Sequence, residues 1–227
     1  MKVAISGALG NMGRLTFDAI QDQPDIEYAG GFARIADQSM GIYDNLEQLL
    51  DERQPEVIVD FTPRPMTQTV ARTAVERGIS PVVGSSEWND EERGALLALC
   101  DKKRVGALIV PNFAIGAVLM MRFAEQAALF FPSVEIIEVH RAEKRDKPSG
   151  TATAAAARIR ETVGAEVPIH SLRMQGALAH HEVICSNAGE LLTIRHDSFS
   201  RESFAPGILS AIRHVRALPS LGIGLPL

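Results

Sequence analysis

The stretch Lys2-Val-Ala-Ile-Ser-Gly-Ala-Leu-Gly-Asn-Met-Gly13 decides the fold class of this chain, because a short β-rich run leads directly into a glycine-rich turn. Its glycines have the spacing G-x-x-G-x-x-G, a variant of the dinucleotide-binding fingerprint. In that fingerprint one glycine permits the tight turn, the next lets the backbone approach a pyrophosphate, and the last lets the helix pack against the strand. Glycines also serve other tight turns, but the preceding strand and the helical pattern at 14–21 favour a dinucleotide site. The candidate cofactor-binding residues are Gly7, Ala8, Leu9, Gly10, Asn11, Met12 and Gly13.

The second β-rich run, Glu27–Phe32, is expected to end near the adenosine ribose of such a cofactor. An acidic residue there would hold the ribose 2′-hydroxyl, whereas an arginine would favour a 2′-phosphate. Ala33 and Arg34 occupy this position, so the carboxylate is missing and a guanidinium is present. Arg34 is therefore a candidate cofactor-binding residue, although a solvated loop residue would look the same. The sequence predicts NADPH, NADH or both, and it argues against strict selection for NAD.

Short apolar runs alternate with helical patterns through the first half of the chain. The runs are Val57–Asp60, Pro81–Val83 and Val105–Val110, with helical patterns between them at 66–77 and 89–103. This alternation indicates βαβ units and a parallel sheet.

The strands after residue 133 follow a different pattern. Val183–Cys185 and Leu191–Ile194 flank Ser186–Gly189, a turn-rich group that suggests a hairpin and an antiparallel sheet. A late helix is expected at 204–215. The predicted fold class is α/β, with a Rossmann-like parallel-sheet domain plus a smaller α+β domain whose sheet is mainly antiparallel.

A second candidate site lies between an apolar run at 134–139 and an alanine-rich helical pattern at 152–158. His140 and Lys144 follow the predicted strand, and Ser149-Gly150-Thr151 precedes the predicted helix. A helix start presents unpaired N–H groups and the positive end of the macrodipole, and therefore accepts a carboxylate or a phosphate. Charged loops with Ser or Thr caps are also common as plain connectors. Together with the dinucleotide site, this loop suggests catalysis on an acidic small molecule.

Composition narrows the function classes. The 227 residues carry a net charge of −5, which argues against nucleic acid as a partner. The two cysteines show no metal spacing and fit a reducing compartment. His180-His181 lacks a neighbouring ligand cluster, so it is interpreted as a strand-edge pair and no metal is assigned. The longest apolar tract, 114–131, contains Arg122 and Glu125 and predicts a core helix, not a membrane span. With no signal-peptide layout, a cytoplasmic protein is expected.

The motifs together resemble one family closely, the bacterial 4-hydroxy-tetrahydrodipicolinate reductases (dihydrodipicolinate reductases) of lysine and diaminopimelate biosynthesis. The resemblance is strongest at His140-Arg-Ala-Glu-Lys144 and Asp146-Lys-Pro-Ser-Gly-Thr-Ala152, which look like the family signature His-His-x-x-Lys-x-Asp-Ala-Pro-Ser-Gly-Thr-Ala. It also covers the glycine motif at 7–13 and the following segments: Val59-Asp-Phe-Thr62, Gly84-Ser-Ser86, Pro111-Asn-Phe113, His180-His-Glu-Val183 and Ser200-Arg-Glu-Ser-Phe204.

The resemblance implies a role for each matching residue. It makes Lys144 the proton donor and His140 a donor or orienting partner in NAD(P)H-dependent reduction of a cyclic dicarboxylate. It adds cofactor contacts at Gly84, Ser85, Ser86, Pro111, Asn112 and Phe113, and substrate contacts at Arg141, Ser149, Gly150 and Thr151. It implies a cofactor domain of residues 1–112 and 204–227, a substrate and oligomerisation domain of residues 113–203, and a homotetramer joined through the antiparallel sheets.

This sequence departs from the family pattern at a few positions. Arg141 stands where a second, substrate-contacting histidine is usual, Lys147 replaces an alanine, Ser85-Ser86 replaces a Thr-Thr pair, and Ala33 replaces an acidic residue. Arginine and histidine differ in length and geometry, so Arg141 bears on substrate specificity. Two alternatives therefore stay open: another nicotinamide-dependent reductase of an acidic imine or aldehyde, and a non-catalytic nucleotide-binding sensor. Retention of both His140 and Lys144 argues against the sensor, because binding alone needs no proton donor.

Overall fold

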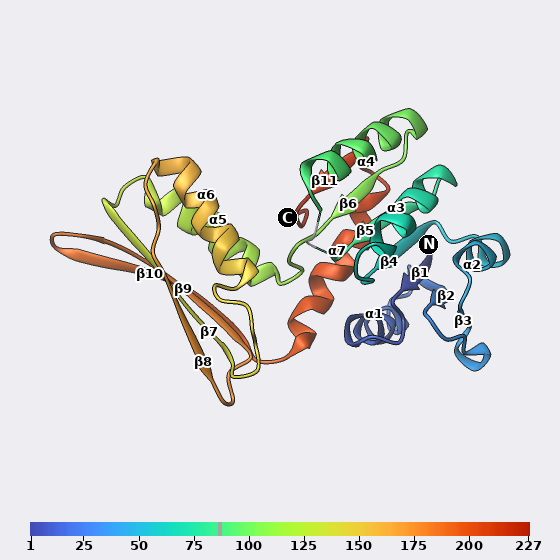
Figure 1. The fold of residues 1–227 in the computed structure, drawn as a ribbon, viewed down its shortest axis with the longest axis horizontal. Helices are drawn as coiled ribbons and strands as arrows, with labels where there is room; N and C mark the ends of the chain where they lie inside the picture. The colour runs from blue at the N-terminus through green and yellow to red at the C-terminus, as the bar shows by residue number, and fades with distance from the viewer. Residues whose placement is uncertain (86–87) are drawn as a thin grey trace. The chain divides into compact units, whose positions relative to one another are not determined.

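The computed structural model describes residues 1–85 and 88–227 (Figure 1). It forms two compact units: unit 1 comprises Met1–Phe113 and Phe204–Leu227, and unit 2 comprises Ala114–Ser203. Phe113 was predicted to belong to the second domain, but it lies in unit 1. Its ring packs edge-on against Phe61, with 5.8 Å between ring centroids. Its carbonyl oxygen lies so close to Gly207 that a Cβ there would come within 1.9 Å.

Unit 1 is built on a seven-stranded parallel sheet of order β11-β6-β5-β4-β1-β2-β3. The strands are β1 Lys2–Ser6, β2 Glu27–Phe32, β3 Ile42–Tyr43, β4 Val57–Asp60, β5 Ser80–Val83, β6 Ala107–Ile109 and β11 Leu221–Ile223. The central strands β1, β4 and β5 are mainly apolar, and every residue in them except Lys2 is buried, as expected where helices cover both faces. The predicted parallel sheet is therefore confirmed. The strand order reverses at β1, whose neighbours are β2 and β4, and such a switch point is where open α/β sheets bind ligands.

Helices cover both faces of this sheet (Figure 1). They are α1 Asn11–Gln21, α2 Leu46–Arg53, α3 Met66–Glu76, α4 Asp90–Lys103 and α7 Ala205–Val215, with a short 3-10 turn at Gln38–Met40. Helix α4 begins at a capping box in which the side chains of Asn89 and Glu92 each accept the other's backbone N–H. The sequence predicted α1 from residue 14, but the helix begins at Asn11, so Gly13 lies inside it.

Unit 2 holds a four-stranded sheet of order β10-β9-β7-β8, formed by β7 Ser133–Arg141, β8 Ile169–Met174, β9 Ala179–Asn187 and β10 Glu190–Ser198. The β9–β10 hairpin is confirmed, with Asn187 opposite Glu190. Strands β7 and β9 are also antiparallel, but β8 runs parallel to β7 because helix α6 connects them. Helices α5 Ile115–Ala128 and α6 Gly150–Val163 pack beside the sheet, and a 3-10 turn spans Arg201–Phe204.

In the described part of the chain, no helix has the combination of length and apolar character needed to cross a bilayer.

Candidate active site

The glycine loop joins β1 to α1 in unit 1. Gly7 has a φ of +77°, a left-handed conformation that glycine adopts without strain, and its N–H donates to the Phe32 carbonyl at 2.9 Å. A Cβ on Gly13 would lie 2.3 Å from the Gly7 carbonyl oxygen, so this glycine is required for helix α1 to approach the loop. A Cβ on Gly10 would meet only that same oxygen, at 3.2 Å. Gly10 precedes the first turn of α1, where N–H groups and the helix dipole favour an anion.

The other predicted cofactor residues gather at the carboxyl ends of the parallel strands. Arg34 is exposed just after β2, and Gly84 and Ser85 follow β5. A Cβ on Gly84 would lie 2.6 Å from the Phe61 ring, so glycine is required there. Pro111, Asn112 and Phe113 follow β6, whereas Ser86 lies outside the described residues. The loops after β1, β2, β5 and β6 therefore share one edge of the sheet, as a cofactor laid across that edge would require.

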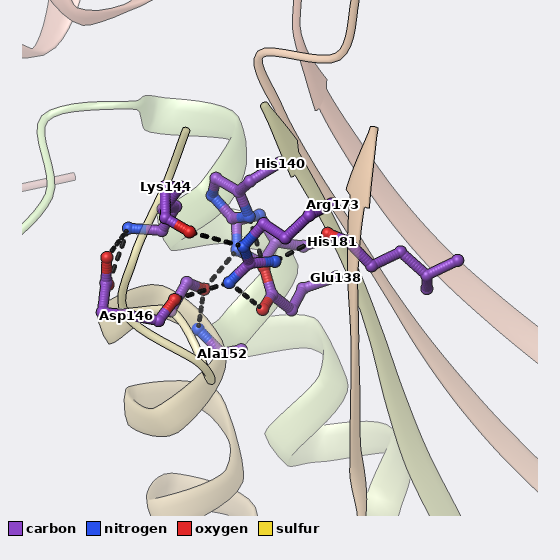
Figure 2. Close-up of polar contacts among 9 residues, drawn as sticks. Glu138, His140, Lys144, Asp146, Ala152, Arg173 and His181 are labelled. Carbon is purple, nitrogen blue, oxygen red and sulfur yellow. Dashed lines mark hydrogen bonds and ion pairs between the residues drawn. The ribbon is translucent and has the colours of Figure 1, made fainter. Parts of the chain in front are cut away.

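In unit 2, strand β7 directs Glu138 and His140 to the same face, because side chains two residues apart lie on one side of a strand. Glu138 is fully buried, and its Oε2 pairs with Nδ1 of the buried His140. Its Oε1 accepts a hydrogen bond of 3.0 Å from Nη2 of Arg173 on β8 (Figure 2). The parallel register puts Arg173 directly opposite His140. A buried carboxylate thus has a cation on one oxygen and an imidazole on the other.

Arg173 also holds the loop that carries Lys144. Its Nε donates to the Lys144 carbonyl at 3.1 Å, and its Nη2 donates to the Asp146 carbonyl at 2.6 Å. Its Nη1 donates to the carbonyl of Leu172 at 2.6 Å. Only 7% of the Arg173 side chain is exposed. One guanidinium therefore joins the Glu138 carboxylate to the backbone of the 142–148 loop (Figure 2).

The Lys144 ammonium is bound by a neighbouring carboxylate. Its Nζ donates to both oxygens of Asp146, at 2.9 and 2.7 Å. This hydrogen bond is the main reason why the pKa of Asp146 lies below its ordinary value. The Lys144 side chain is 23% exposed, so an incoming acidic ligand could replace Asp146 as its partner.

His181, on β9, completes the cluster. Its ring contacts the His140 ring edge-on, with 5.1 Å between centroids, and its Nε2 lies 3.1 Å from Ser149 Oγ. Ser149 is the N-cap of α6 and accepts the Ala152 N–H at 3.2 Å, so its own hydrogen is available to His181. The prediction that His180-His181 is a strand-edge pair was wrong for His181, because that residue is buried beside His140. Its alternation with the buried Val183 and Cys185 was the signal that could have placed it.

The structure brings His140, Lys144 and Ser149 into one region, and Gly150 and Thr151 begin helix α6 there. Arg141 is exposed at the end of β7 and, by strand alternation, belongs to the opposite face from His140. Its part in substrate binding stays a prediction. Four residues of the cluster were not among the predicted site residues: Glu138, Asp146, Arg173 and His181. Glu138 could have been found two residues before His140, but Arg173 carries no local signal.

In the ranges 1–85 and 88–227, one group of residues has ligand atoms close enough to share a metal ion: Glu138, His140 and His181, within 4.8 Å of one another. Glu138 already has the Arg173 guanidinium on one oxygen and His140 on the other. A cation would have to displace His140 while facing that guanidinium. The hydrogen bonds account for the cluster, and we assign no metal to it.

Protonation of His181 should destabilise the protein. Burial, followed by the nearby charge of His140, lowers the pKa of His181 from 6.5 to about 4. The unfolded chain then binds this proton more tightly than the folded one, so the free energy of unfolding falls as the pH drops from 6.5 towards 4. At pH 5 the loss is about 2 kcal/mol. His181→Gln should lose less stability than the parent between pH 7 and pH 5 in urea unfolding; equal losses would contradict this account.

Comparisons with known proteins agree over nearly the whole chain. Residues 1–113 match the family model "Dihydrodipicolinate reductase, N-terminus", and residues 116–222 match "Dihydrodipicolinate reductase, C-terminus". A 4-hydroxy-tetrahydrodipicolinate reductase of Moorella thermoacetica is 39% identical, with 99% of this chain and 96% of the relative aligned. The protein of that name from Synechococcus elongatus is 38% identical over 98% of this chain and 96% of its own.

A solved structure shows the same fold. The dipicolinate-bound dihydrodipicolinate reductase from Paenisporosarcina sp. TG-14 superposes with a TM-score of 0.91 at 31% identity, covering 99% of this chain and 97% of the other. This likeness confirms the predicted fold class, a Rossmann-like parallel-sheet domain with a smaller α+β domain. Since the two family models span nearly all of the sequence and relatives above 30% identity align along its length, the chain belongs to the dihydrodipicolinate reductase family.

Proposed function

We propose that this protein reduces 4-hydroxy-tetrahydrodipicolinate to tetrahydrodipicolinate with NADPH or NADH, in the diaminopimelate pathway to lysine. The relatives of that name and the dipicolinate-bound neighbour support the substrate. The observation that carries the proposal is the cluster in unit 2, where His140 and Lys144 lie in the strand–loop–helix segment that ends at the N-terminus of α6. A spectrophotometric assay of NADPH oxidation with freshly prepared substrate tests it. The same assay with other acidic imines and aldehydes tests whether the protein is instead a reductase of another substrate. If no substrate leads to NADPH oxidation, the non-catalytic sensor is favoured.

A nicotinamide cofactor fits the glycine loop of unit 1, because the Gly10 position bears no side chain at the start of α1. When bound, the cofactor supplies the hydride that adds to an electron-poor ring carbon, and its chemistry is its own. In unit 2, Ser149, Gly150 and Thr151 at the start of α6 hold a substrate carboxylate. Lys144 donates the proton that the reduced ring requires, and His140 acts as its partner. One hydride and one proton enter, and the 4-hydroxyl leaves as water.

The exposed Arg34 should act on NADPH more than on NADH. We expect Arg34→Ala to weaken NADPH binding and to change NADH binding little, because only NADPH has a 2′-phosphate for the guanidinium to pair with. A charge-assisted hydrogen bond of this kind contributes about 1.5–3 kcal/mol, which is roughly a 10- to 150-fold change in Kd. Titration calorimetry with both cofactors measures the difference, and NADH is the internal control. Equal losses for the two cofactors would remove this role from Arg34.

Assembly as a homotetramer through the unit 2 sheets completes the proposal. Strand alternation leaves exposed apolar side chains of β8 and β10 on the face opposite Glu138 and His140, among them Leu172, Met174 and Leu191. A second copy of this sheet is the occupant that we expect there, and light scattering of the purified protein tests the size. Both cysteines are free and buried, which suits the reducing cytoplasm where we expect the protein to act.

A further inference from the structure

We propose that Glu138 is a positioning residue that fixes the tautomer of His140, so that Nε2 is the ring nitrogen left to exchange a proton with Lys144, which donates its own proton to the substrate. The inference rests on the role proposed above for His140 and adds to it a named atom and a named partner. Glu138 is fully buried and acts through His140, without contact to the substrate.

Glu138 is ionised in the folded protein. Burial by itself raises the pKa of this carboxyl, but the neighbouring Ser171 hydroxyl, the Arg173 guanidinium and His140 together outweigh burial and lower the pKa below its ordinary value. The carboxylate is therefore ionised at neutral pH, and an ionised carboxylate only accepts hydrogen bonds. The hydrogen between Glu138 Oε2 and His140 Nδ1 consequently belongs to Nδ1.

The bond to Glu138 decides which ring nitrogen of His140 carries the proton. A neutral histidine carries one ring proton, and the bond made by one nitrogen decides the state of the other. With Nδ1–H directed at Glu138, neutral His140 has a free electron pair at Nε2, and protonated His140 carries its transferable proton there. In both states Nε2 points away from the carboxylate, because the two nitrogens lie on different sides of the ring.

The groups around His140 set its protonation together. Burial is the main cause that lowers its pKa, Glu138 on β7 raises it, and Lys144 in the loop and Arg173 on β8 lower it. His181 on β9 packs its ring against the same imidazole. Removal of the Glu138 charge would therefore lower the pKa of His140 further, besides releasing its tautomer.

Arg173 binds both Glu138, which orients His140, and the loop that carries the proton donor Lys144. Its guanidinium binds Glu138 Oε1 and also the carbonyls of Lys144 and Asp146. The carboxylate that orients His140 and the loop that carries Lys144 are thus held by the same planar group. Lysine at position 173 would keep the charge but lose the fork that makes these contacts at once.

The test is ¹⁵N NMR of histidine-labelled protein, in which the ring nitrogen shifts report the tautomer, with His140→Gln used to assign the His140 signals. In the parent, neutral His140 should carry its proton on Nδ1. In Glu138→Gln an Nε2–H form should appear, because the amide can donate to Nδ1 as well as accept from it. We expect kcat to fall on the order of 10²-fold. The pH limb that reports His140 should move to lower pH, and Glu138→Asp should recover part of the loss.

A matched control lies on the same two strands. Glu135 on β7 contacts His170 on β8 at 2.7 Å, but this pair is exposed on the opposite face of the sheet. This is also the face on which we expect a second copy of the sheet, so light scattering must first show that Glu135→Gln keeps the size of the parent. With the assembly unchanged, Glu135→Gln should alter only the His170 signals and leave kcat and the pH profile unchanged.

Three outcomes would overturn the inference: a parent His140 with its proton on Nε2, a Glu138→Gln variant that keeps the Nδ1–H form, or one that keeps the parent's kcat and pH profile. The measurement on the parent decides the matter even where the variant does not fold. Full turnover by His140→Gln would instead refute the catalytic role of His140, and that result is separate from the tautomer.

Discussion

Replacement of Lys144 by alanine should lower kcat by about 10²- to 10⁴-fold, the range for loss of a positioned general acid. Affinity for NADPH should stay unchanged, because Lys144 belongs to unit 2 and the glycine loop belongs to unit 1. A proton donor acts on the transition state, so the loss should appear in kcat more than in KM. Steady-state kinetics at saturating NADPH and a separate cofactor titration measure the two effects.

Lys147 provides the matched control for this experiment. It lies three residues further along the same loop and is exposed, and Lys147→Ala removes the same charge from the loop. We expect this variant to keep its kcat. If the Lys144 variant turns over at the parent rate, or if both variants lose activity equally, Lys144 is not the proton donor and the loop acts through its overall charge.

Gly10→Val should abolish binding of either cofactor while the protein stays folded. A Cβ at Gly10 meets only the Gly7 carbonyl oxygen, at 3.2 Å, so the loop accommodates it with a small shift. The valine methyl groups would then occupy the space that a pyrophosphate needs at the start of α1. We expect Kd to rise by at least 10²-fold, or about 3 kcal/mol, in calorimetry with NADPH and NADH.

Gly13→Ala separates this effect from damage to the fold. Its Cβ would lie 2.3 Å from the Gly7 oxygen and 2.7 Å from Ala8 Cα, both backbone atoms, so α1 would have to move. This variant should show a lower Tm, whereas Gly10→Val should unfold near the parent temperature. Parental cofactor affinity in Gly10→Val would mean that the loop is an ordinary turn.

The sequence predicted the larger part of unit 1 because its strands are buried on both faces and appear as continuous apolar runs. Strand β4, Val57–Asp60, is an example. The helices between the strands, such as Met66–Glu76, were predicted from their helical pattern. Strands β3 and β11 were not predicted, because two or three residues are too short to show a period. The parallel β7–β8 pair was not predicted either, since strand direction depends on where α6 returns the chain and not on residue type.

The residues of the candidate site also differ in how far the sequence could predict them. His140 and Lys144 were selected because they lie at a strand end beside a helix start, a local feature of the sequence. Glu138 and His181 are also local in principle, because alternation along β7 and β9 places them on the buried face. Arg173 is different: it lies 35 residues from Glu138, and only the register of the folded sheet makes them partners.

The division of unit 1 into two stretches of chain has a consequence during protein synthesis. Strand β11 pairs with β6, α7 packs against β4, β5 and β6, and Arg213 binds the Asp25 carboxylate through two hydrogen bonds of 2.8 Å. Strand β11, helix α7 and Arg213 all follow the roughly 90 residues of unit 2 in the chain, whereas the strands and the Asp25 carboxylate that they contact precede unit 2. A ribosome that adds about 5–20 residues per second needs roughly 5–20 s to make those residues. Until β11 and α7 follow, the nascent unit 1 has an unpaired edge at β6 and lacks the helix that covers β4, β5 and β6.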